Sequence, residues 1–527
     1  MTGGGGGGGG ARMSDDLVTL TIDGVPVGVP KGTLVIEAAK QAGVLVPHYC
    51  YHPGLPVAGV CRMCLVEIEK APKLQIACAT LVADGMVVRT QSKAAKDARM
   101  GVLELLLINH PLDCPICDQA GECELQDFTF QEGRPSTRYS PDYAKRFNPV
   151  EDFGPDVLYV PNRCILCTRC VRFMEDVAQE PVLNVSERGD RAYIGIHPDA
   201  RLDHPWAGNV VDLCPVGSLL SKDFLHRARA WELDKTASIC TGCSQGCNVT
   251  LDTRDNVVVR VRPRPNLEVN RYFICDHGRA SYRWMSRGDR IEAPLVKRVA
   301  VDWEEALARA ASLLRGASGA AVSLVSPKAS TEALFLAREL FAGFDWTGAF
   351  QVVMGEEAPL AGVPNLALRA ERAPNGTGAE LLGYTRDYAA ALTAAETAAV
   401  VLVLDVPEPV VRTAGALIYV GTSLPDAARD AAIVLPMANI AEEDGTFVNR
   451  DARVQRYFQA KPAPGMARPA WWVFAELLAA LGRGEPLASA SDAFDALARA
   501  AAPFAGLSYA GLGMAGKTAK LEVGVGA

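Results

Sequence analysis

Several features are missing from this 527-residue sequence, and each absence excludes a class of protein. No run of 18 uninterrupted apolar residues occurs, so no transmembrane helix is expected. The first residues lack a basic segment followed by an apolar run, so no secretory signal is expected. Basic residues are too few for non-specific nucleic-acid binding, because 53 Lys and Arg stand against 61 Asp and Glu and the net charge is -8.

The chain opens with eight consecutive glycines, Gly3–Gly10. No Gly-Lys-Ser/Thr follows them and no strand precedes them, so they are not a phosphate-binding loop. Residues 1–16 are therefore predicted to form a disordered leader, and Met13 is an alternative start of the protein.

Cysteine is the informative residue, because all 15 lie between Cys50 and Cys275. An odd number excludes complete intramolecular pairing, and without a signal peptide a reducing compartment favours metal binding or catalysis over disulfides. Together with one histidine the cysteines form four sets of four predicted ligands. The first to fourth sets are Cys50, Cys61, Cys64 and Cys78; His110, Cys114, Cys117 and Cys123; Cys164, Cys167, Cys170 and Cys214; and Cys240, Cys243, Cys247 and Cys275.

Two kinds of metal site fit this spacing. An iron–sulfur cluster is held by four thiolates, or by three and an imidazole, and a C-x2-C turn brings two sulfurs to neighbouring corners. Tetrahedral zinc sites also use C-x2-C pairs. The C-x2-C-x2-C run of the third set is common for a cubane cluster and awkward for zinc, and four adjacent sets suit an electron path. Iron–sulfur clusters are the prediction, and structural zinc is the alternative.

His110 completes the second set because it lies four residues before a cysteine triplet that lacks a fourth thiolate. The alternative is an ordinary buried or capped histidine at a helix end. Arg163, Arg169 and Arg172 flank the third set and have two interpretations. They either offset the negative charge of a cluster or are solvated surface arginines on a short helix.

Hydrophobic periodicity predicts a small α+β unit of the β-grasp kind at the N-terminus. Asp23-Gly24 between alternating apolar residues predicts a hairpin over Leu17–Val29. A helix over Thr33–Ala42 and three short strands near residues 65–69, 74–77 and 86–90 complete this unit. Ser92 is a predicted cap for a helix over residues 93–108, and the polar, proline-containing segment 132–160 is predicted to be a linker or long loop.

From Val299 onward, strands alternating with helices predict an α/β region with a parallel sheet. Asp302–Leu314 is a predicted helix, and Ala399–Leu404 and Ala416–Val420 are predicted buried strands. The turns lack the Gly-x-Gly-x-x-Gly fingerprint, so no nicotinamide site is inferred there.

The segments HPLDCPICDQAGECELQD (His110–Asp127) and NRCILCTRCVRF (Asn162–Phe173) carry a family resemblance. With the cysteine order, they resemble the G subunits of NADH-quinone oxidoreductase, the large iron–sulfur subunits in the peripheral arm of respiratory complex I. The resemblance is dense from about Leu17 to Gly288. Beyond it, DWEEAL and EEDGTFVNRDARVQ (Glu442–Gln455) resemble the family's molybdopterin-oxidoreductase-like portion, which looks shortened here.

The resemblance implies one [2Fe-2S] cluster in the first set and one [4Fe-4S] cluster in each of the other three. Electrons would pass from a flavin/NADH subunit through the clusters toward quinone-side iron–sulfur subunits, with the fourth cluster apart from the main path. The chain would be a peripheral subunit on the cytoplasmic side of the inner membrane, touching the membrane only through the complex. No catalytic residue, molybdopterin or nucleic-acid partner is expected.

The expected fold class is α+β multidomain. It comprises a Gly-rich leader (1–16), a β-grasp [2Fe-2S] ferredoxin-like domain (17–91), a [4Fe-4S] domain with one histidine ligand (92–134), a [4Fe-4S] ferredoxin-like domain (135–232), a [4Fe-4S] domain of the molybdopterin-oxidoreductase type (233–290) and a shortened α/β molybdopterin-oxidoreductase-like domain (291–527). Three other functions remain open. They are a formate dehydrogenase-like molybdenum enzyme, an iron-iron hydrogenase chain and a zinc-stabilised scaffold.

Overall fold

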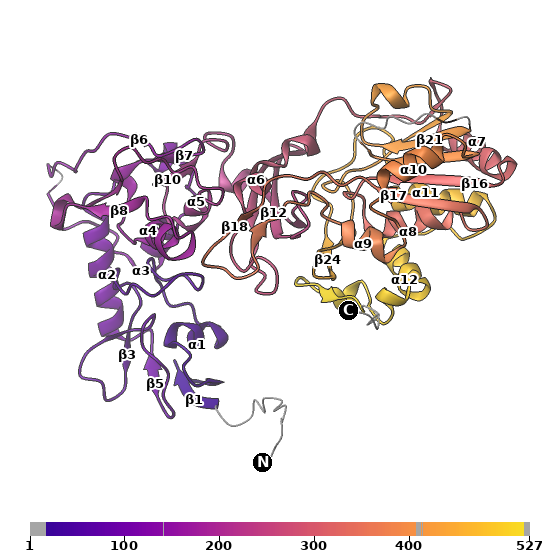
Figure 1. The fold of residues 1–527 in the computed structure, drawn as a ribbon. Coiled ribbons are helices and arrows are strands. Elements are labelled where there is room, and N and C mark those ends of the chain that lie inside the picture. The colour runs from indigo at the N-terminus through magenta and orange to yellow at the C-terminus, as the bar shows by residue number, and fades with distance from the viewer. Residues whose placement is uncertain (1–16, 141, 407–412, 414, 521–527) are drawn as a thin grey trace, which may run out of the picture. The chain divides into compact units, whose positions relative to one another are not determined.

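The computed structural model describes residues 17–140, 142–406, 413 and 415–520. The predicted leader, residues 1–16, lies outside the described residues. The chain divides into two compact units (Figure 1). Each unit has its own hydrophobic cores. Unit 1 comprises Met1–Asp203 and Val210–Trp231, and unit 2 comprises His204–Asn209 and Glu232–Ala527. The finer division into a leader and five domains stays a prediction.

Unit 1 begins with the predicted β-grasp arrangement. The sheet has the order β2-β1-β5-β3-β4, in which β1 and β5 run parallel and the other neighbours run antiparallel. Asp23 and Gly24 both have positive φ, as a tight two-residue hairpin turn requires. The elements are β1 (Leu17–Ile22), β2 (Val25–Pro30), α1 (Val35–Gln41), β3 (Leu65–Ile68), β4 (Gln75–Ile76) and β5 (Val87–Arg89).

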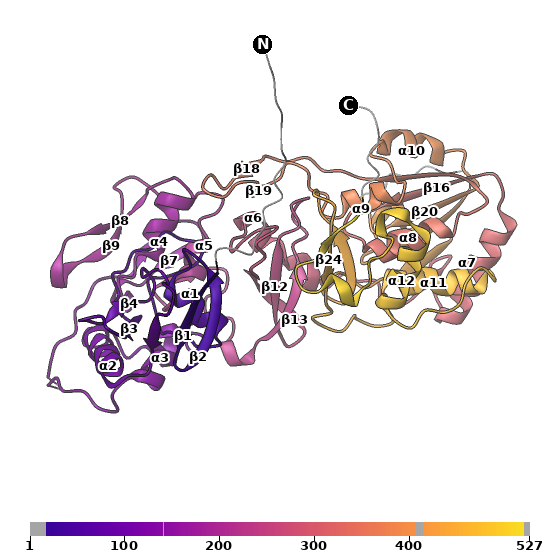
Figure 2. The ribbon, with the colours of Figure 1, turned by 90° about the horizontal axis from the view of Figure 1, so that it is seen from below.

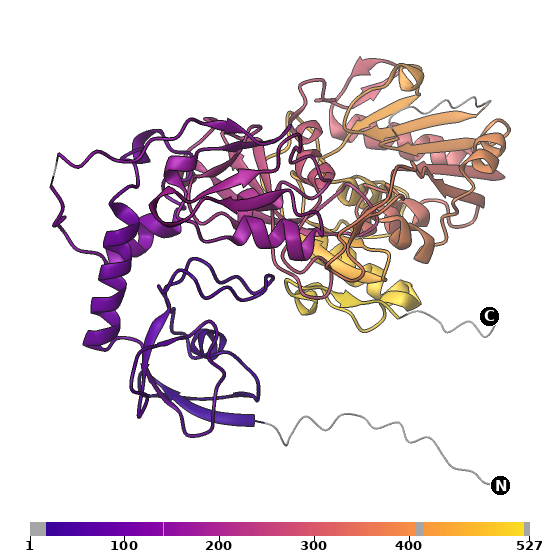
Figure 3. The same ribbon diagram turned by 60° about the vertical axis from the view of Figure 1, so that its left-hand side comes forward.

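Helix α2 (Lys93–Leu107) follows the sheet and is one long purple helix in Figure 3. The side chain of Ser92 accepts a hydrogen bond from the Ala95 amide at 3.3 Å, so the predicted cap is confirmed. Helix α3 (Glu124–Glu132) packs near α2, and the fully buried Arg99 reaches Glu132 at 3.0 Å. This ion pair ties the two helices together.

The rest of unit 1 consists of short elements around two small sheets, β10-β7-β6 and β8-β9. Strands β6 and β7 lie in the segment predicted to be a linker, and this part of the prediction is wrong. Strand β7 is regular because it pairs with β10, about 60 residues later. The elements are a 3-10 turn (Cys114–Ile116), β6 (Glu151–Asp152), β7 (Val157–Tyr159), α4 (Arg169–Arg172), a π-turn (Phe173–Val177), β8 (Leu183–Ser186), β9 (Tyr193–Ile196), α5 (Asn209–Leu213) and β10 (Leu219–Ser221).

Unit 2 begins with an antiparallel sheet of three strands and a short helix that carries the last cysteine at its start. A small hairpin formed by a later part of the chain, β18 (Ala358–Pro359) with β19 (Ala367–Leu368), also belongs to this unit. The first elements are β11 (Asp234–Ile239), β12 (Asn248–Arg254), β13 (Val257–Pro263) and α6 (Asp276–Ala280).

The larger part of unit 2 is a seven-stranded sheet with the order β15-β14-β22-β21-β20-β16-β17. The five strands from β22 to β17 are parallel, which confirms the predicted α/β region. Its strands are β14 (Leu295–Val296), β15 (Val299–Ala300), β16 (Ala320–Val325), β17 (Asp345–Phe350), β20 (Val400–Leu404), β21 (Ala416–Gly421) and β22 (Ile433–Pro436).

Helices cover both faces of this sheet (Figure 2). Each face has its own cluster of buried hydrophobic residues. Helix α10 (Tyr388–Ala395) lies on one face. The other face carries α7 (Trp303–Gly316), α8 (Thr331–Glu339), α11 (Ala470–Ala480) and α12 (Ala490–Ala500), and α9 (Gly376–Leu381) lies near α8. Strands β23 (Gly445–Val448), β24 (Arg453–Tyr457) and β25 (Lys517–Thr518) form a last small sheet. Within the described ranges, no helix has the length and apolarity to cross a bilayer.

Candidate metal centres

The first set gathers on the loops that connect α1, β3 and β5 in unit 1. Cys50, Cys64 and Cys78 are buried, and Cys61 is half-buried. The Cys50 amide donates to Sγ of Cys61 at 3.5 Å. The side chains of Cys61 and Cys78 lie close enough to Cys50 to shift its pKa, and that of Cys64 does the same for Cys78. Hydrogen bonds from Cys61 and Cys78 lower the pKa of Cys50, while the bond to Cys50 and burial raise the pKa of Cys61. All four predicted ligands therefore lie together.

The second set lines one cavity beyond the C-terminal end of α2. His110, Cys114, Cys117 and Cys123 all face it, with Gly217 closing one side. Nδ1 of His110 is buried and has no hydrogen-bond partner among the described residues. Burial lowers the pKa of His110 to about 4, so at neutral pH the imidazole is uncharged, which is the form that binds metals.

Close packing marks the same cavity. A Cβ on Gly217 would lie 2.1 Å from Sγ of Cys117. Any residue other than glycine at position 217 would therefore displace that sulfur. Burial raises the pKa of Cys123 to about 11, whereas Cys114 is exposed.

The third set lines a second cavity of unit 1, built from the α4 loop and the segment before β10. Burial raises the pKa of Cys164 to about 11 and that of Cys167 to about 12. Leu166 and Thr168 have φ values of 54° and 61°, and the Leu166 amide donates to Sγ of Cys164 at 3.4 Å. Left-handed residues between cysteines turn backbone amides toward the sulfurs, which suits an anionic centre.

The fourth set lies in unit 2, and all four of its cysteines are buried. Amides of Gly242 and Gly278 donate to the sulfurs of Cys240 and Cys275, at 3.4 and 3.3 Å. A Cβ on Gly278 would lie 2.9 Å from Sγ of Cys240 and 3.4 Å from Sγ of Cys275. The structure therefore brings the distant Cys275 beside the first cysteine of its set.

The residues present fit iron–sulfur clusters on three observations: the soft donor set, the unpartnered Nδ1 of His110, and the amides that donate to ligand sulfurs. Within the described ranges, no three His, Cys, Asp or Glu side chains form a group that could hold a metal ion. A cluster distributes its ligands over two or four iron atoms, so they need not converge on a single metal ion.

The three arginines beside the third set are buried, so their interpretation as solvated surface residues is wrong. Nε of Arg163 donates to the Asp113 carboxylate at 2.9 Å, and Asp113 immediately precedes Cys114. Arg169 forms a similar contact with Glu124, which immediately follows Cys123. Sequence reasoning missed these acidic partners, although a carboxylate next to a cysteine in each case was a visible signal.

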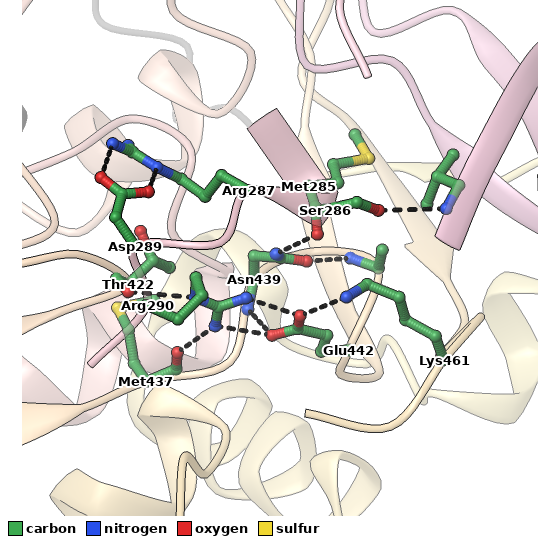
Figure 4. Close-up of polar contacts among 12 residues, drawn as sticks. Met285, Ser286, Arg287, Asp289, Arg290, Thr422, Met437, Asn439, Glu442 and Lys461 are labelled. Carbon is green, nitrogen blue, oxygen red and sulfur yellow. Dashed lines mark hydrogen bonds and ion pairs between the residues drawn. The ribbon is translucent and has the colours of Figure 1, made fainter. Parts of the chain in front are cut away.

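The segment Glu442–Gln455 is held by a buried ionic cluster in unit 2 (Figure 4). The Glu442 carboxylate accepts four hydrogen bonds: two from Arg290 at 2.6 and 2.7 Å, one from Lys461 at 2.8 Å and one from the Asn439 amide at 3.0 Å. The exposed fraction of its side chain is 0%. Because both oxygens are occupied by the chain's own donors, Glu442 has a structural role.

Five family models match the chain, in the order expected. They are the 2Fe-2S iron-sulfur cluster binding domain (residues 15–93), the NADH-ubiquinone oxidoreductase-G iron-sulfur binding region (99–138), the ferredoxin-like domain of NADH-quinone oxidoreductase subunit 3 (154–220), the molybdopterin oxidoreductase Fe4S4 domain (233–287) and molybdopterin oxidoreductase (413–480). These models indicate domains that bind 2Fe-2S and 4Fe-4S clusters, followed by an α/β part of the molybdopterin-oxidoreductase type.

Several curated relatives are named as subunits of NADH oxidoreductases. The G subunit of NADH-quinone oxidoreductase from Rickettsia bellii is 41% identical over 61% of this chain and 47% of its own length. The mitochondrial NADH-ubiquinone oxidoreductase 78 kDa subunit of Neurospora crassa is 47% identical over 55% of this chain and 39% of its own length. The G subunit from Streptomyces coelicolor is 42% identical over 58% of this chain and 37% of its own length. The resemblance to the G subunits of NADH-quinone oxidoreductase is thus confirmed.

The matched region spans less than half the length of each of these relatives. Their names do not favour the formate dehydrogenase alternative. A chain in the crystal structure of an NAD+-reducing [NiFe]-hydrogenase matches at 31% identity with a TM-score of 0.36. The match covers 40% of this chain and 90% of the hydrogenase chain.

Proposed function

We propose that this chain is an electron-relay subunit of an NADH:quinone oxidoreductase, a part of the NADH dehydrogenase enzyme complex. The observation that carries the proposal is that three of the four predicted ligand sets lie within one compact unit, where each gathers its cysteines around a loop cluster or a cavity. Closely spaced redox sites are what an electron path needs.

The proposed ligands are the four sets as the sequence defines them. The first would hold a [2Fe-2S] cluster, and the second, third and fourth would each hold a [4Fe-4S] cluster, with His110 as one ligand of the second. The proposed domains are 17–91, 92–134, 135–232, 233–290 and 291–527, after the leader 1–16. The last domain is proposed to have a structural role without molybdopterin, and the contacts of Arg290 and Lys461 with Glu442 would stabilise its fold.

Bound clusters supply one-electron transfer, and the chain's own residues hold them, exclude water and set their charge environment. Neutral His110 in place of a thiolate makes the second site less negative, which favours its reduced form, as imidazole ligation does in Rieske centres. No residue of this chain has to move a proton from a substrate.

The proposed partners are other peripheral-arm subunits: a flavin/NADH-binding subunit that supplies electrons and iron–sulfur subunits on the quinone side that accept them. The chain would be a peripheral subunit on the cytoplasmic side of the inner membrane, reaching the membrane only through the complex.

Iron and acid-labile sulfide analysis of the anaerobically purified full chain tests the proposal. We expect about fourteen iron atoms per chain, from two, four, four and four. Cys64→Ser should remove about two of them and Cys117→Ser about four. Colourless protein that is rich in zinc and poor in sulfide would instead support the zinc-stabilised scaffold.

A further inference from the structure

Arg172 is a buried cation whose hydrogen bonds, in the part of the chain that the structure describes, go to neutral oxygens. The exposed fraction of Arg172 is 9%. Nη2 donates to the carbonyl oxygen of Cys50 at 2.5 Å and to that of Cys167 at 3.2 Å. The other donors reach the carbonyl of Pro56 and, at 3.3 Å, the hydroxyl of Thr168. The two cysteines belong to different ligand sets, the first and the third.

A guanidinium that leaves water without a counter-charge is destabilising, and neutral carbonyls satisfy its donors but not its charge. Arg163 and Arg169 differ, because each has a carboxylate partner, Asp113 and Glu124. The Asp176 carboxylate attracts the Arg172 guanidinium, but Asp176 is exposed to water. The positive charge of Arg169 repels that of Arg172. Cys167 and Cys50 also act electrostatically on Arg172, so thiolates bound to a cluster at each site would supply the missing negative charge.

We propose that Arg172 is a positioning residue shared by the first and third metal sites, where it supplies the positive charge that both need and spaces their loops. The proposal rests on the proposed function, because it requires a cluster at each site. One-electron reduction adds one negative charge to a site, so a fixed cation beside two sites stabilises the reduced form of both. Its bonds to Cys50 and Cys167 hold the two ligand loops at one separation.

Arg172→Gln removes the charge and keeps a hydrogen-bonding side chain, whereas Arg172→Lys keeps the charge and loses the planar fork. The measurement is a redox titration of the full anaerobic chain, followed by electron paramagnetic resonance of each cluster. We expect Arg172→Gln to weaken reduction of the first and third sites about tenfold each, which lowers each midpoint potential by about 59 mV. The second and fourth sites should stay unchanged.

Arg172→Lys should restore more than half of both shifts, because charge rather than shape carries the effect. Arg138→Gln is the matched control, since the Arg138 side chain is 68% exposed and has a carboxylate partner, Glu104. Equal shifts in the Gln and Lys variants, or unchanged potentials in Arg172→Gln with both clusters present, overturn the proposal. A wild-type chain without cluster signals would instead overturn the proposed function.

The Lys variant also decides the case in which Arg172→Gln fails to load its clusters. Signals from both sites in Arg172→Lys, with neither in Arg172→Gln, support the counter-charge role. Loss of either signal in Arg172→Lys contradicts it, because the charge is still present there.

Discussion

The guanidinium of Arg169 and the carboxylate of Glu124 form a two-point ion pair, with Nη1–Oε1 at 3.0 Å and Nη2–Oε2 at 3.1 Å. The same guanidinium donates to the carbonyl oxygens of Tyr51 at 2.9 Å and Leu213 at 3.2 Å. Each of these three partners is the chain neighbour of a proposed ligand, one in each set of unit 1. One side chain therefore connects the three proposed metal sites of unit 1.

Arg169→Gln is expected to destabilise unit 1 by about 2–3 kcal/mol. Breaking a buried ion pair usually destabilises by about 3–5 kcal/mol, and the 39% exposed Glu124 side chain reduces that because water solvates the remaining charge. The melting temperature of unit 1, followed by hydrogen exchange of the full chain, should fall by about 5–10 °C. The melting temperature of Arg169→Lys should fall less than that of Arg169→Gln. An unchanged melting temperature in Arg169→Gln would show that the ion pair has no structural role.

Gly217→Ala is expected to remove the cluster of the second set alone. The new Cβ would lie 2.1 Å from Sγ of Cys117, so that sulfur has to leave its position. Iron content should fall by about four atoms per chain, with loss of one paramagnetic signal. Gly101→Ala is the control, because a Cβ at Gly101 in α2 meets no atom within 4 Å and alanine favours helix. Full iron content in Gly217→Ala would contradict the assignment.

Cys275→Ala tests whether the fourth set lies on the electron path. We expect one paramagnetic signal to disappear and the region around β12 and α6 to become less stable, because Cys275 both caps α6 and closes its set. NADH-to-quinone turnover should survive in the assembled complex. If a fully assembled variant complex had no turnover, the fourth site would be part of the path.

Glu332→Gln is expected to stabilise unit 2 at neutral and alkaline pH. Glu332 is fully buried, one carboxylate oxygen has no partner among the described residues, and burial raises its pKa to about 7. The folded protein keeps this proton up to about pH 7, whereas the unfolded chain releases it near 4.5. The stabilising contribution of this proton is therefore fully present below pH 4.5 and is lost as the pH rises from 4.5 to about 7.

The decrease amounts to about 3 kcal/mol at most, and the glutamine variant should abolish it. Denaturant unfolding of wild type and variant at pH 5 and pH 8 measures the difference. Glu396→Gln, an exposed site, is the control. Parallel pH profiles for wild type and Glu332→Gln would exclude Glu332 as the titrating group.

Elements whose causes are local were predictable from the sequence. The Asp23-Gly24 turn and the Ser92 cap depend on residues within a few positions of each other, and both are found. Strands β20 and β21 were recognised because a strand buried on both faces is a continuous apolar run. Strand β7 was missed because its regularity comes from pairing with β10, and no local pattern encodes that partner.

By itself, the sequence determined which side chains can bind metal, because thiolate spacing is a covalent property of the chain, and its motifs already identified the family resemblance. Only the tertiary structure decided what surrounds those ligands. The charges of Arg163, Arg169 and Arg172 are the same in any fold, but their burial and their carbonyl and carboxylate partners come from segments about 45 to 120 residues away. Long-range packing sets the desolvation and neighbouring charge of each site, and these cannot be deduced from local sequence.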